Sequence, residues 1–275
     1  MADSREPIRV MMWSAPRCMS TAIERSILTS EDAEVFNEMY CAVHHFGPCS
    51  SHFPIRLAPY FSYQWVKDEL EKNYPGKNVV FGKDFAYALD GDYRSLPKGF
   101  THTILIRNPN SVFNSMKRVI KKSLFLRWFS NRIETHFPDT LLFKHLWDLY
   151  THARDNLQQT PIVIDADDFA KNPEAMMQLY CHKTGIPFRK SMLKWKPTNI
   201  WSINWHCSYA LSFAGWCLGY YTSLLSSSGF RQSKKTDDFV ELDATDDEAR
   251  RLASKNMKYY DRLYANRLVL HDQYL

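Results

Sequence analysis

Residues 9–30 combine a short apolar run, a tight Ala-Pro-Arg turn and a segment that starts at Ser20-Thr21 with apolar residues at helical spacing. The pattern predicts a strand, a loop and a helix. The first N–H groups of a helix lack intrahelical partners and carry the positive end of the helix dipole. With the guanidinium of Arg17 and two hydroxyls beside them, they favour an anion such as phosphate or sulfate.

The turn from Ala15 to Thr21 differs from the common nucleotide-triphosphate loop. That loop, G-x-x-x-x-G-K-[ST], needs two glycines and a lysine, and the turn contains neither. ATP and GTP are therefore disfavoured as ligands. A buried strand followed by a capped helix, with no ligand, is the alternative interpretation of this motif taken alone.

A second motif begins with the apolar run Thr103–Ile106, which predicts another strand. Asn108-Pro109 then starts a helix, because Asn is a favoured N-cap and Pro a favoured first helical residue. Arg107 lies at the carboxyl end of the strand, and Ser115 about two turns into the helix. Ligands of open parallel sheets bind outside the carboxyl ends of the strands. The two motifs are therefore expected to converge on one ligand with two phosphate groups.

With these motifs the chain resembles sulfotransferases that use 3′-phosphoadenosine 5′-phosphosulfate (PAPS). The resemblance is closest to a branch marked by a P-R-x-x-S-T loop, an Asn/His-Glu segment followed by an aromatic, and a K-D-x-A-Y stretch. It spans nearly the whole chain, although better-known cytosolic enzymes have a lysine where Arg17 stands. The matching segments are Pro16–Thr21, Asn37–Tyr40, Lys83–Tyr87, Asp165–Asp168, Gly185–Phe188, Trp201–His206 and a Tyr-rich carboxyl helix.

The resemblance implies a set of cofactor contacts. The first loop would hold the 5′-phosphosulfate and the second motif the 3′-phosphate, with adenosine 3′,5′-bisphosphate (PAP) as the product. The residues that match the two motifs are Arg17, Cys18, Met19, Ser20, Thr21, Arg107 and Ser115. We also expect Gly229 and Phe230 to contact the cofactor; they lie in the polar segment Ser226–Asp238, which is predicted to be a mobile loop.

Sulfuryl transfer requires in-line attack, a base and several cations, with no obligatory metal. Glu38 follows the apolar Val35-Phe36 at the expected carboxyl end of the second strand, and it is the favoured base. His44 and His45 are alternatives because a histidine titrates near neutral pH, or they are ordinary loop histidines. The expected catalytic set is Glu38, Lys83, Arg17 and His44.

Several of these residues also have a structural interpretation. Lys83 either stabilises the transferring sulfuryl group or pairs with Asp84. Asp165, Asp167 and Asp168 are favoured as a helix cap and turn cluster over a metal site, and no metal site is predicted. Trp201, Trp205 and His206 either shape the acceptor pocket or belong to the core.

Composition and charge bound the class of protein. With 275 residues and 45% apolar content, residues 1–275 are predicted to form a single domain. The net charge of +5 comes with no Lys/Arg run longer than two residues, so no nucleic-acid partner is expected. The six cysteines lack a C-x-x-C pair, which favours reduced thiols in a cytoplasmic protein.

The amino-terminal residues lack the pattern of a secretory signal, because the apolar run after Ile8 is soon broken. The uncharged stretch Cys207–Gly229 is rich in Ser, Tyr and Gly, so we interpret it as a helix or lid over an apolar acceptor pocket rather than a membrane span. No stable membrane insertion is expected, and a homodimer is left open.

Strand and helix patterns alternate along the chain, which predicts an α/β fold: a mostly parallel sheet flanked by helices, with a P-loop architecture as the resemblance also implies. Strands are expected at 9–13, 34–37, 78–81, 103–106 and 161–164, and helices at 21–30, 57–73, 109–122, within 139–158, at 173–184 and at about 245–263.

Three hypotheses follow for function. The first is transfer of a sulfuryl group from PAPS to a hydroxyl or amine of a small, perhaps lipophilic acceptor. The second is a P-loop kinase for a small molecule, which the missing G-K-[ST] disfavours. The third is a homologue that binds the nucleotide, or another anionic ligand, in the same cleft without sulfuryl transfer.

Overall fold

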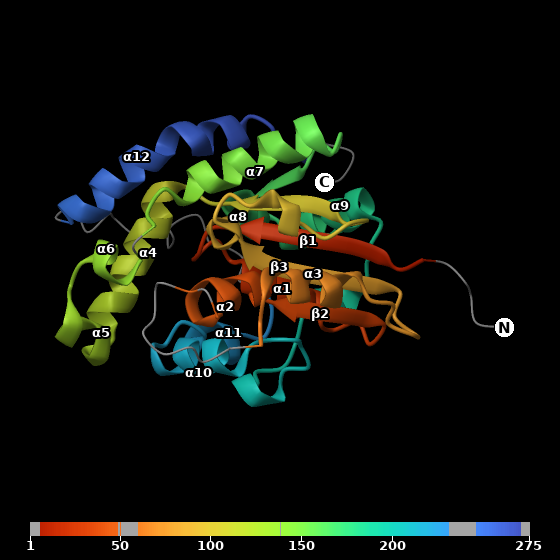
Figure 1. Ribbon diagram of the computed structural model, residues 1–275, viewed down its shortest axis with the longest axis horizontal. Coiled ribbons are helices and arrows are strands. Elements are labelled where there is room, and N and C mark those ends of the chain that lie inside the picture. The colour runs from red at the N-terminus through yellow and green to blue at the C-terminus, as the bar shows by residue number, and fades with distance from the viewer. Residues whose placement is uncertain (1–5, 49, 51–59, 138, 231–245, 271–275) are drawn as a thin grey trace.

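Five parallel strands form a single sheet in the computed structural model, in the order β2-β3-β1-β4-β5 (Figure 1). The structure describes residues 6–48, 50, 60–137, 139–230 and 246–270. The strands are β1 (Ile8–Ser14), β2 (Ala33–Asn37), β3 (Val79–Phe85), β4 (Thr101–Ile106) and β5 (Ile162–Asp165). The predicted fold class and all five predicted strands are confirmed.

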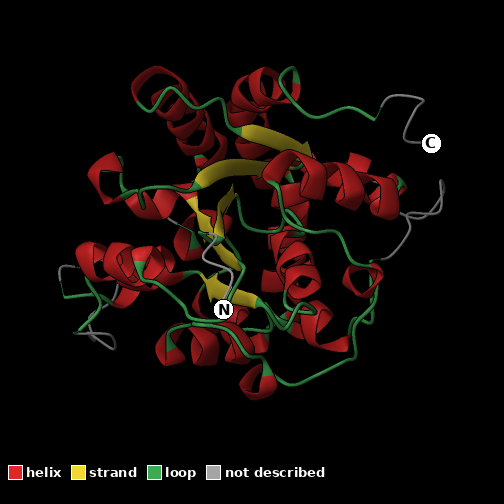
Figure 2. Cartoon of the chain, turned by 90° about the vertical axis from the view of Figure 1, so that its right-hand side faces the viewer, coloured by secondary structure: helices red, strands yellow, loops and turns green. Residues whose placement is uncertain are grey.

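β1 is the central strand of the sheet. Its register pairs Met12 with Lys83 of β3 on one side and with Thr103 of β4 on the other. Residues 10–14 are all buried, because helices cover both faces of the sheet (Figure 2). A strand buried on both faces requires a nearly continuous apolar run, which is why its sequence does not alternate.

Helices α4 (Pro109–Lys122) and α9 (Pro173–Thr184) match the predicted ranges at both ends. The side chains of Asn108 and Asn172 accept the N–H groups of Asn110 and Ala175, and a proline follows each cap. α1 (Ser20–Ile27) ends three residues earlier than predicted. The other predicted helices are α3 (Tyr63–Glu71), α7 (Leu142–Asn156) and α12 (Asp247–Tyr264); residues 57–59 of the range expected for α3 lie outside the described residues.

Several short helices were not predicted. These are α2 (Met39–Phe46), α5 (Leu124–Phe129), α6 (Ile133–His136) and α8 (Ala166–Lys171). The expected lid segment forms α10 (Tyr209–Cys217) and α11 (Thr222–Ser226). Short 3-10 helices occupy Ala86–Leu89, Tyr93–Ser95, Lys190–Leu193 and Ile200–Ser202. In Figure 1, α7 and α12 run along one side of the molecule, and α10 and α11 lie at the opposite side.

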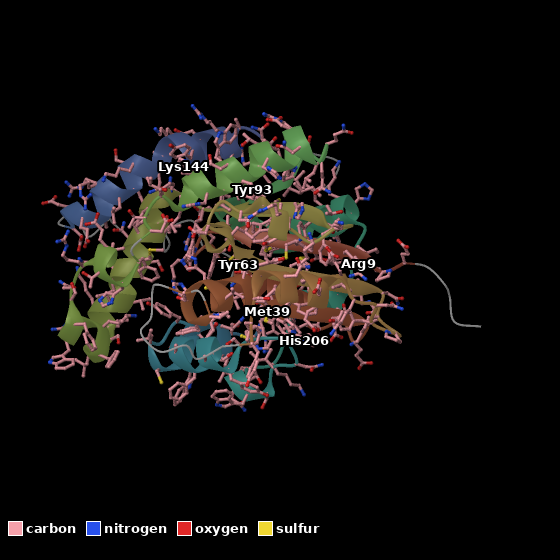
Figure 3. The ribbon with its side chains drawn as sticks, viewed as in Figure 1. Arg9, Met39, Tyr63, Tyr93, Lys144 and His206 are labelled. Atoms are coloured by element: carbon pink, nitrogen blue, oxygen red, sulfur yellow. The ribbon has the colours of Figure 1, made fainter. Side chains whose placement is uncertain are left out.

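The two ends of the strands define two edges of the sheet. Arg9, near the start of β1, lies toward the amino edge, and Met39, just after β2, lies toward the carboxyl edge (Figure 3). Because all strands are parallel, the residues that follow β1, β2 and β4 emerge at the same carboxyl edge. That edge therefore carries the Ala15–Thr21 loop, Glu38 and Arg107.

Candidate functional site

The loop between β1 and α1 has the backbone geometry of an anion-binding turn. Arg17 and Met19 adopt left-handed conformations, with φ of 68° and 67°. Met19 is the N-cap of α1, and its side chain caps no N–H group. Left-handed residues at such a turn let successive N–H groups face a common concavity. The start of α1 can therefore offer backbone donors to an anion.

Cys18 contributes to this loop through its backbone. Its side chain is fully buried, and the thiol lies 3.9 Å from the carbonyl oxygen of Pro16. Burial raises the pKa of the Cys18 thiol to about 12. The sulfur is thus neutral and enclosed, and only the N–H group of Cys18 is suited to an anion.

Residues from both sequence motifs meet beside this loop. The Nε of Arg17 donates to Oγ of Ser115 at 3.1 Å, and Nη1 of Arg107 donates to the carbonyl oxygen of Arg17 at 3.4 Å. Burial lowers the pKa of Arg17, and the positive charges of Arg107 and Arg118 lower it further. We call Arg17, Arg107, Arg118 and Ser115 the arginine cradle. Its nearby guanidinium groups repel one another, so an anion between them would be stabilised.

Arg118 was not predicted, although helix spacing could have found it. It lies one turn beyond Ser115 on α4, and so on the same face of that helix. A carboxylate partly balances the cradle, since Nε of Arg107 lies 3.2 Å from Oδ1 of Asp167 in α8. This ion pair is partly exposed, so water and ligands can compete with it.

The connection between α10 and α11 reaches the cradle. Nη1 of Arg17 donates to the carbonyl oxygen of Tyr220 at 3.3 Å. The ring of Tyr220 contacts Phe137, which follows α6, with 6.0 Å between centroids. The two segments therefore meet beside the Ala15–Thr21 loop, and no local sequence signal identified Tyr220.

A second cluster surrounds Glu38, the expected base. Glu38 follows β2 in a left-handed conformation, and its N–H donates to the carbonyl oxygen of Lys83 at 2.8 Å. Its Oε1 forms an ion pair with Nζ of Lys83, and its Oε2 accepts from the hydroxyl of Tyr221 at 3.3 Å. Burial lowers the pKa of Lys83, but the carboxyl groups of Glu38, Glu24 and Asp84 together more than offset this, so the pKa is raised overall. Lys83 therefore stays charged and holds Glu38 in place.

Asp84 has a role that differs from the predicted pairing with Lys83. Its carboxylate accepts the N–H groups of Tyr40 at 2.6 Å and Cys41 at 3.1 Å, and so caps the start of α2. The expectation of a Lys83–Asp84 ion pair is wrong, because successive strand residues point to opposite faces of the sheet. Burial raises the pKa of Asp84 to about 7.

Glu24 adds an unexpected carboxyl group on the buried face of α1. It is fully buried, and among the described residues neither of its side-chain oxygens has a hydrogen-bond partner. Burial raises the pKa of Glu24 well above its usual value, and the charge of Lys83 only partly opposes this. Burial therefore favours the protonated form of its side chain. We call Glu24, Glu38, Lys83 and Asp84 the buried acid cluster.

His44 and His45 lie in α2 rather than in a loop. Nε2 of His45 lies 3.2 Å from the hydroxyl of Tyr87, and the ring of His44 meets those of His45 and Tyr87 edge-on. Both histidines thus pack against the K-D-x-A-Y segment. His44 remains an alternative base by sequence, whereas Glu38 is the residue that contacts Lys83.

The remaining predicted residues lie in other surroundings. The ring of Phe230 packs on Phe169 and Trp195, and Gly229 forms an antiparallel bridge with Lys194. Trp201 is 56% exposed, so the expectation of a core residue is wrong at that position.

The structural interpretation of the aspartate cluster is confirmed. The side chain of Asp165 accepts the N–H groups of Asp167 and Asp168, and so caps α8. Within the described ranges, no three His, Cys, Asp or Glu side chains gather in a way that could hold a metal ion. Residues 231–238 of the predicted mobile loop lie outside the described residues.

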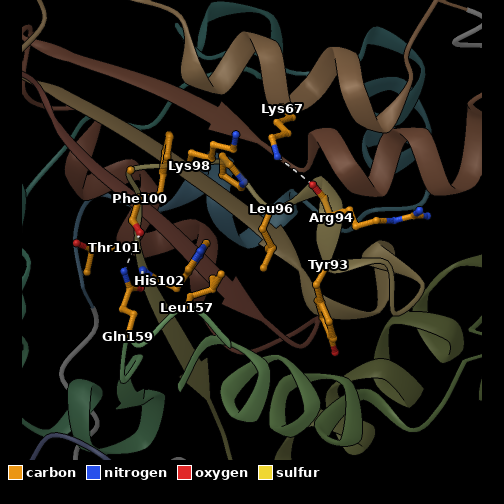
Figure 4. A pocket seen from close by; sticks show the side chains of 12 residues that line it. Lys67, Tyr93, Arg94, Leu96, Lys98, Phe100, Thr101, His102, Leu157 and Gln159 are labelled. Carbon is orange, nitrogen blue, oxygen red and sulfur yellow. Dashed lines mark hydrogen bonds between the residues drawn. The ribbon is translucent and has the colours of Figure 1, made fainter. Parts of the chain in front are cut away.

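A cavity of about 560 Å³ lies away from these clusters (Figure 4). Its lining includes Tyr93 and Gln159, and also Phe100 and His102 at the start of β4 and therefore at the amino edge of the sheet. Burial lowers the pKa of His102 to about 4, and this neutral ring accepts a hydrogen bond from Nε1 of Trp13 at 3.1 Å. We interpret the cavity as separate from the candidate site, because the two predicted motifs converge at the opposite edge.

Comparisons with known proteins give limited similarity. No protein-family model matches the chain. It is 29% identical over 245 residues to the branched-chain-amino-acid aminotransferase-like protein 1 of Arabidopsis thaliana, which is 84% of this chain and 38% of that protein. It is 31% identical over 101 residues to the sulfotransferase ppzF of Metarhizium rileyi, which is 34% of this chain and 29% of that protein. The chain thus spans well under half the length of the Arabidopsis relative.

Among solved structures, the chain is similar to the sulfotransferase domain from the curacin biosynthetic pathway. The TM-score is 0.46 at 14% identity, covering 92% of this chain and 98% of that one. None of the described helices is both long enough and apolar enough to cross a lipid bilayer.

Proposed function

We propose that this chain is a sulfotransferase that moves a sulfuryl group from PAPS to a hydroxyl or amine of a small acceptor. The observation that carries the proposal is the convergence of Arg17, Arg107 and Ser115 beside the uncapped start of α1. Two guanidinium groups from sequence motifs 90 residues apart suit a ligand with phosphate groups at two positions. Sequence similarity of part of the chain to a Metarhizium sulfotransferase agrees with it.

In this proposal the cradle binds the donor. The N–H groups of residues 17–21 and Arg17 hold the 5′-phosphosulfate, and Arg107 and Ser115 hold the 3′-phosphate. Gly229 and Phe230 are proposed as further cofactor contacts on the side of α8. The bond between sulfur and the 5′-phosphate oxygen breaks as the acceptor oxygen or nitrogen bonds to sulfur, and PAP leaves. The fixed positive charges stabilise the negative charge that develops on the phosphate side.

Glu38 is the proposed base for the acceptor proton. Its Oε1 is held by Lys83, whereas Oε2 contacts Tyr221 through a longer hydrogen bond of 3.3 Å. An acceptor hydroxyl that replaces the Tyr221 hydroxyl at Oε2 would place its proton on Glu38. Lys83 fixes the orientation of the carboxylate, and the exposed aromatic side chains of α10 favour a lipophilic acceptor.

Other functions make different demands on the same residues. A P-loop kinase would prefer ADP, and a binding homologue would hold PAP without turnover. The Arabidopsis names refer to proteins more than twice as long as the matched region, so an aminotransferase-like activity is a further alternative to assay.

Ligand-induced thermal stabilisation of the purified chain tests the proposal. PAP at a hundredfold excess over its Kd should add about 2.7 kcal/mol of stability and raise Tm by several degrees, whereas ADP should not. Arg107→Ala should remove the shift, since it removes charge-assisted hydrogen bonds to the 3′-phosphate. Arg94→Ala is the matched control, because that arginine is 91% exposed and pairs with Asp92, outside the cradle.

Turnover of PAPS with a panel of hydroxyl and amine acceptors completes the test. Equal stabilisation by ADP, or a PAP shift that survives in Arg107→Ala, would refute the proposed cofactor site. A specific PAP shift without turnover of any acceptor would favour the binding homologue. Transamination in the presence of pyridoxal phosphate would favour the aminotransferase alternative.

A further inference from the structure

Helix α5 exposes most of its large apolar side chains. The exposed fractions are 80% for Leu124, 58% for Phe125, 80% for Trp128 and 61% for Phe129, whereas Leu126 is buried and anchors the helix against the core. In Figure 1, α5 lies beyond the end of α4, at the margin of the molecule. A contiguous patch of this kind usually marks a surface that binds another partner.

The chain around this patch is strongly basic. Residues 109–133 contain six Lys and Arg residues and no Asp or Glu. Five of these basic side chains are exposed: Arg118, Lys121, Lys122, Arg127 and Arg132. Three acidic side chains lie nearby: Asp246 is 3.9 Å from Lys121, and Glu134 and Glu248 are 2.8 Å and 3.9 Å from Arg132. The patch nevertheless presents an excess of positive charge beside its aromatic rings.

A second group of exposed aromatic side chains lies on α10. It comprises Tyr209, Phe213 and Trp216. The Phe137–Tyr220 ring contact joins the segment after α6 to the connection that follows α10, beside the arginine cradle.

We propose that α5 and the end of α4 dock this protein on an anionic lipid surface. Trp, Phe and Leu side chains suit the boundary between headgroups and acyl chains, and Lys and Arg beside them attract anionic headgroups. The positive charge of the patch favours an anionic lipid surface over a second copy of the chain. A second copy would bring another basic patch against this one, and the two would repel each other. The binding is peripheral and is independent of the proposed transfer activity.

Co-sedimentation of the full chain with lipid vesicles tests the inference. We expect binding to vesicles that mix phosphatidylserine with phosphatidylcholine, and little binding to phosphatidylcholine alone. Raised salt should weaken the binding, since headgroup attraction is screened. Lys122→Gln with Arg127→Gln should lower the partition coefficient roughly 25-fold, at about fivefold for each cation removed. Trp128→Ser with Phe129→Ser should lower it at least about tenfold.

Matched controls lie on other faces of the molecule. Lys183→Gln with Lys190→Gln removes two exposed cations elsewhere, and Trp201→Ser removes an exposed tryptophan outside α5. These variants should bind vesicles as the unchanged protein does. Equal binding to both vesicle types, no binding at low salt, or equal losses in control and test variants would overturn the inference. Concentration-dependent self-association that Trp128→Ser abolishes would instead assign the patch to a second copy.

Discussion

The arginine cradle and the buried acid cluster lie at the same edge of the sheet, but their charges are balanced in opposite ways. Arg17 and Arg107 bring positive charge together, and among the described residues their carboxylate partner is the partly exposed Asp167. In the buried cluster, Lys83 and Glu38 compensate each other and are 1% and 8% exposed. Charge left uncompensated at an accessible edge favours ligand binding, whereas compensated charge in the interior maintains geometry.

The contrast predicts which property each region controls. A change at Arg107, whose ion pair with Asp167 is partly exposed, should alter ligand binding and leave the free energy of unfolding nearly unchanged. Changes in the buried cluster should alter stability as well as chemistry, since their partners would be left buried without compensation.

Glu38→Gln should produce the largest effect. If Glu38 accepts the acceptor proton, kcat should fall by about 10²–10⁴, the range typical of a lost general base. The Kd for PAP, measured by calorimetry, should stay unchanged because the cradle is intact. Glu34→Gln, on the same strand, is the matched control and should retain activity.

The same substitution also removes the ionised partner of Lys83, so stability must be measured beside activity. Glu38→Asp keeps the charge and should restore part of the lost kcat if the carboxylate acts as a base. Full activity in a folded Glu38→Gln protein would exclude Glu38 as the base and favour His44 in that role.

Asp84→Asn should have a smaller effect, on stability. Asparagine can accept fewer hydrogen bonds than a carboxylate, so the cap of α2 weakens, at a cost of about 1–2 kcal/mol. The difference in unfolding free energy should depend on pH. The pKa of Asp84 is raised from 3.8 to about 7 in the folded state, so the folded protein binds more protons between these values.

The direction of the pH dependence of stability follows from this proton uptake. The contribution of Asp84 to stability is fullest below about pH 4 and declines as pH rises toward about 7, so the advantage of the unchanged protein over Asp84→Asn should shrink over that range. Denaturant unfolding of both proteins at several pH values measures this difference in stability. An advantage that grew with pH would mean that the hydrogen bonds from the N–H groups of Tyr40, Cys41 and Phe85 outweigh the effect of burial on the pKa of Asp84.

The sequence predicted the elements whose signals are local. The helices that follow Asn108 and Asn172 carry their own caps, and the five strands carry their own apolar runs. α2 was missed because its cap, Asp84, comes from β3, more than 40 residues later. No local pattern could reveal that the Asn-Glu and Lys-Asp segments hold each other through Glu38–Lys83 and Asp84–Tyr40 contacts.

In the candidate site, too, some residues could be predicted from the sequence and others could not. Arg107 and Ser115 could be placed beside Arg17 because parallel strands end at one edge, and the hydrogen bonds of Arg17 bear out that proximity. Tyr220 and Tyr221 could not, since they reach the site from the α10–α11 connection some 200 residues after the loop.

Glu24→Gln should produce the smallest effect. It tests directly whether charge in the buried acid cluster is balanced. Glu24 is as buried as Lys83, but burial raises its pKa well above the usual value, which favours the neutral form, and glutamine is close to an isostere of that form. The unfolding free energy at pH 7 should change by about 1 kcal/mol or less. Glu24→Leu should also be tolerated, because neither carboxyl oxygen has a partner among the described residues. A loss of several kcal/mol in Glu24→Gln would mean that Glu24 is ionised and shares Lys83 with Glu38; the cluster would then carry excess negative charge rather than balanced charge.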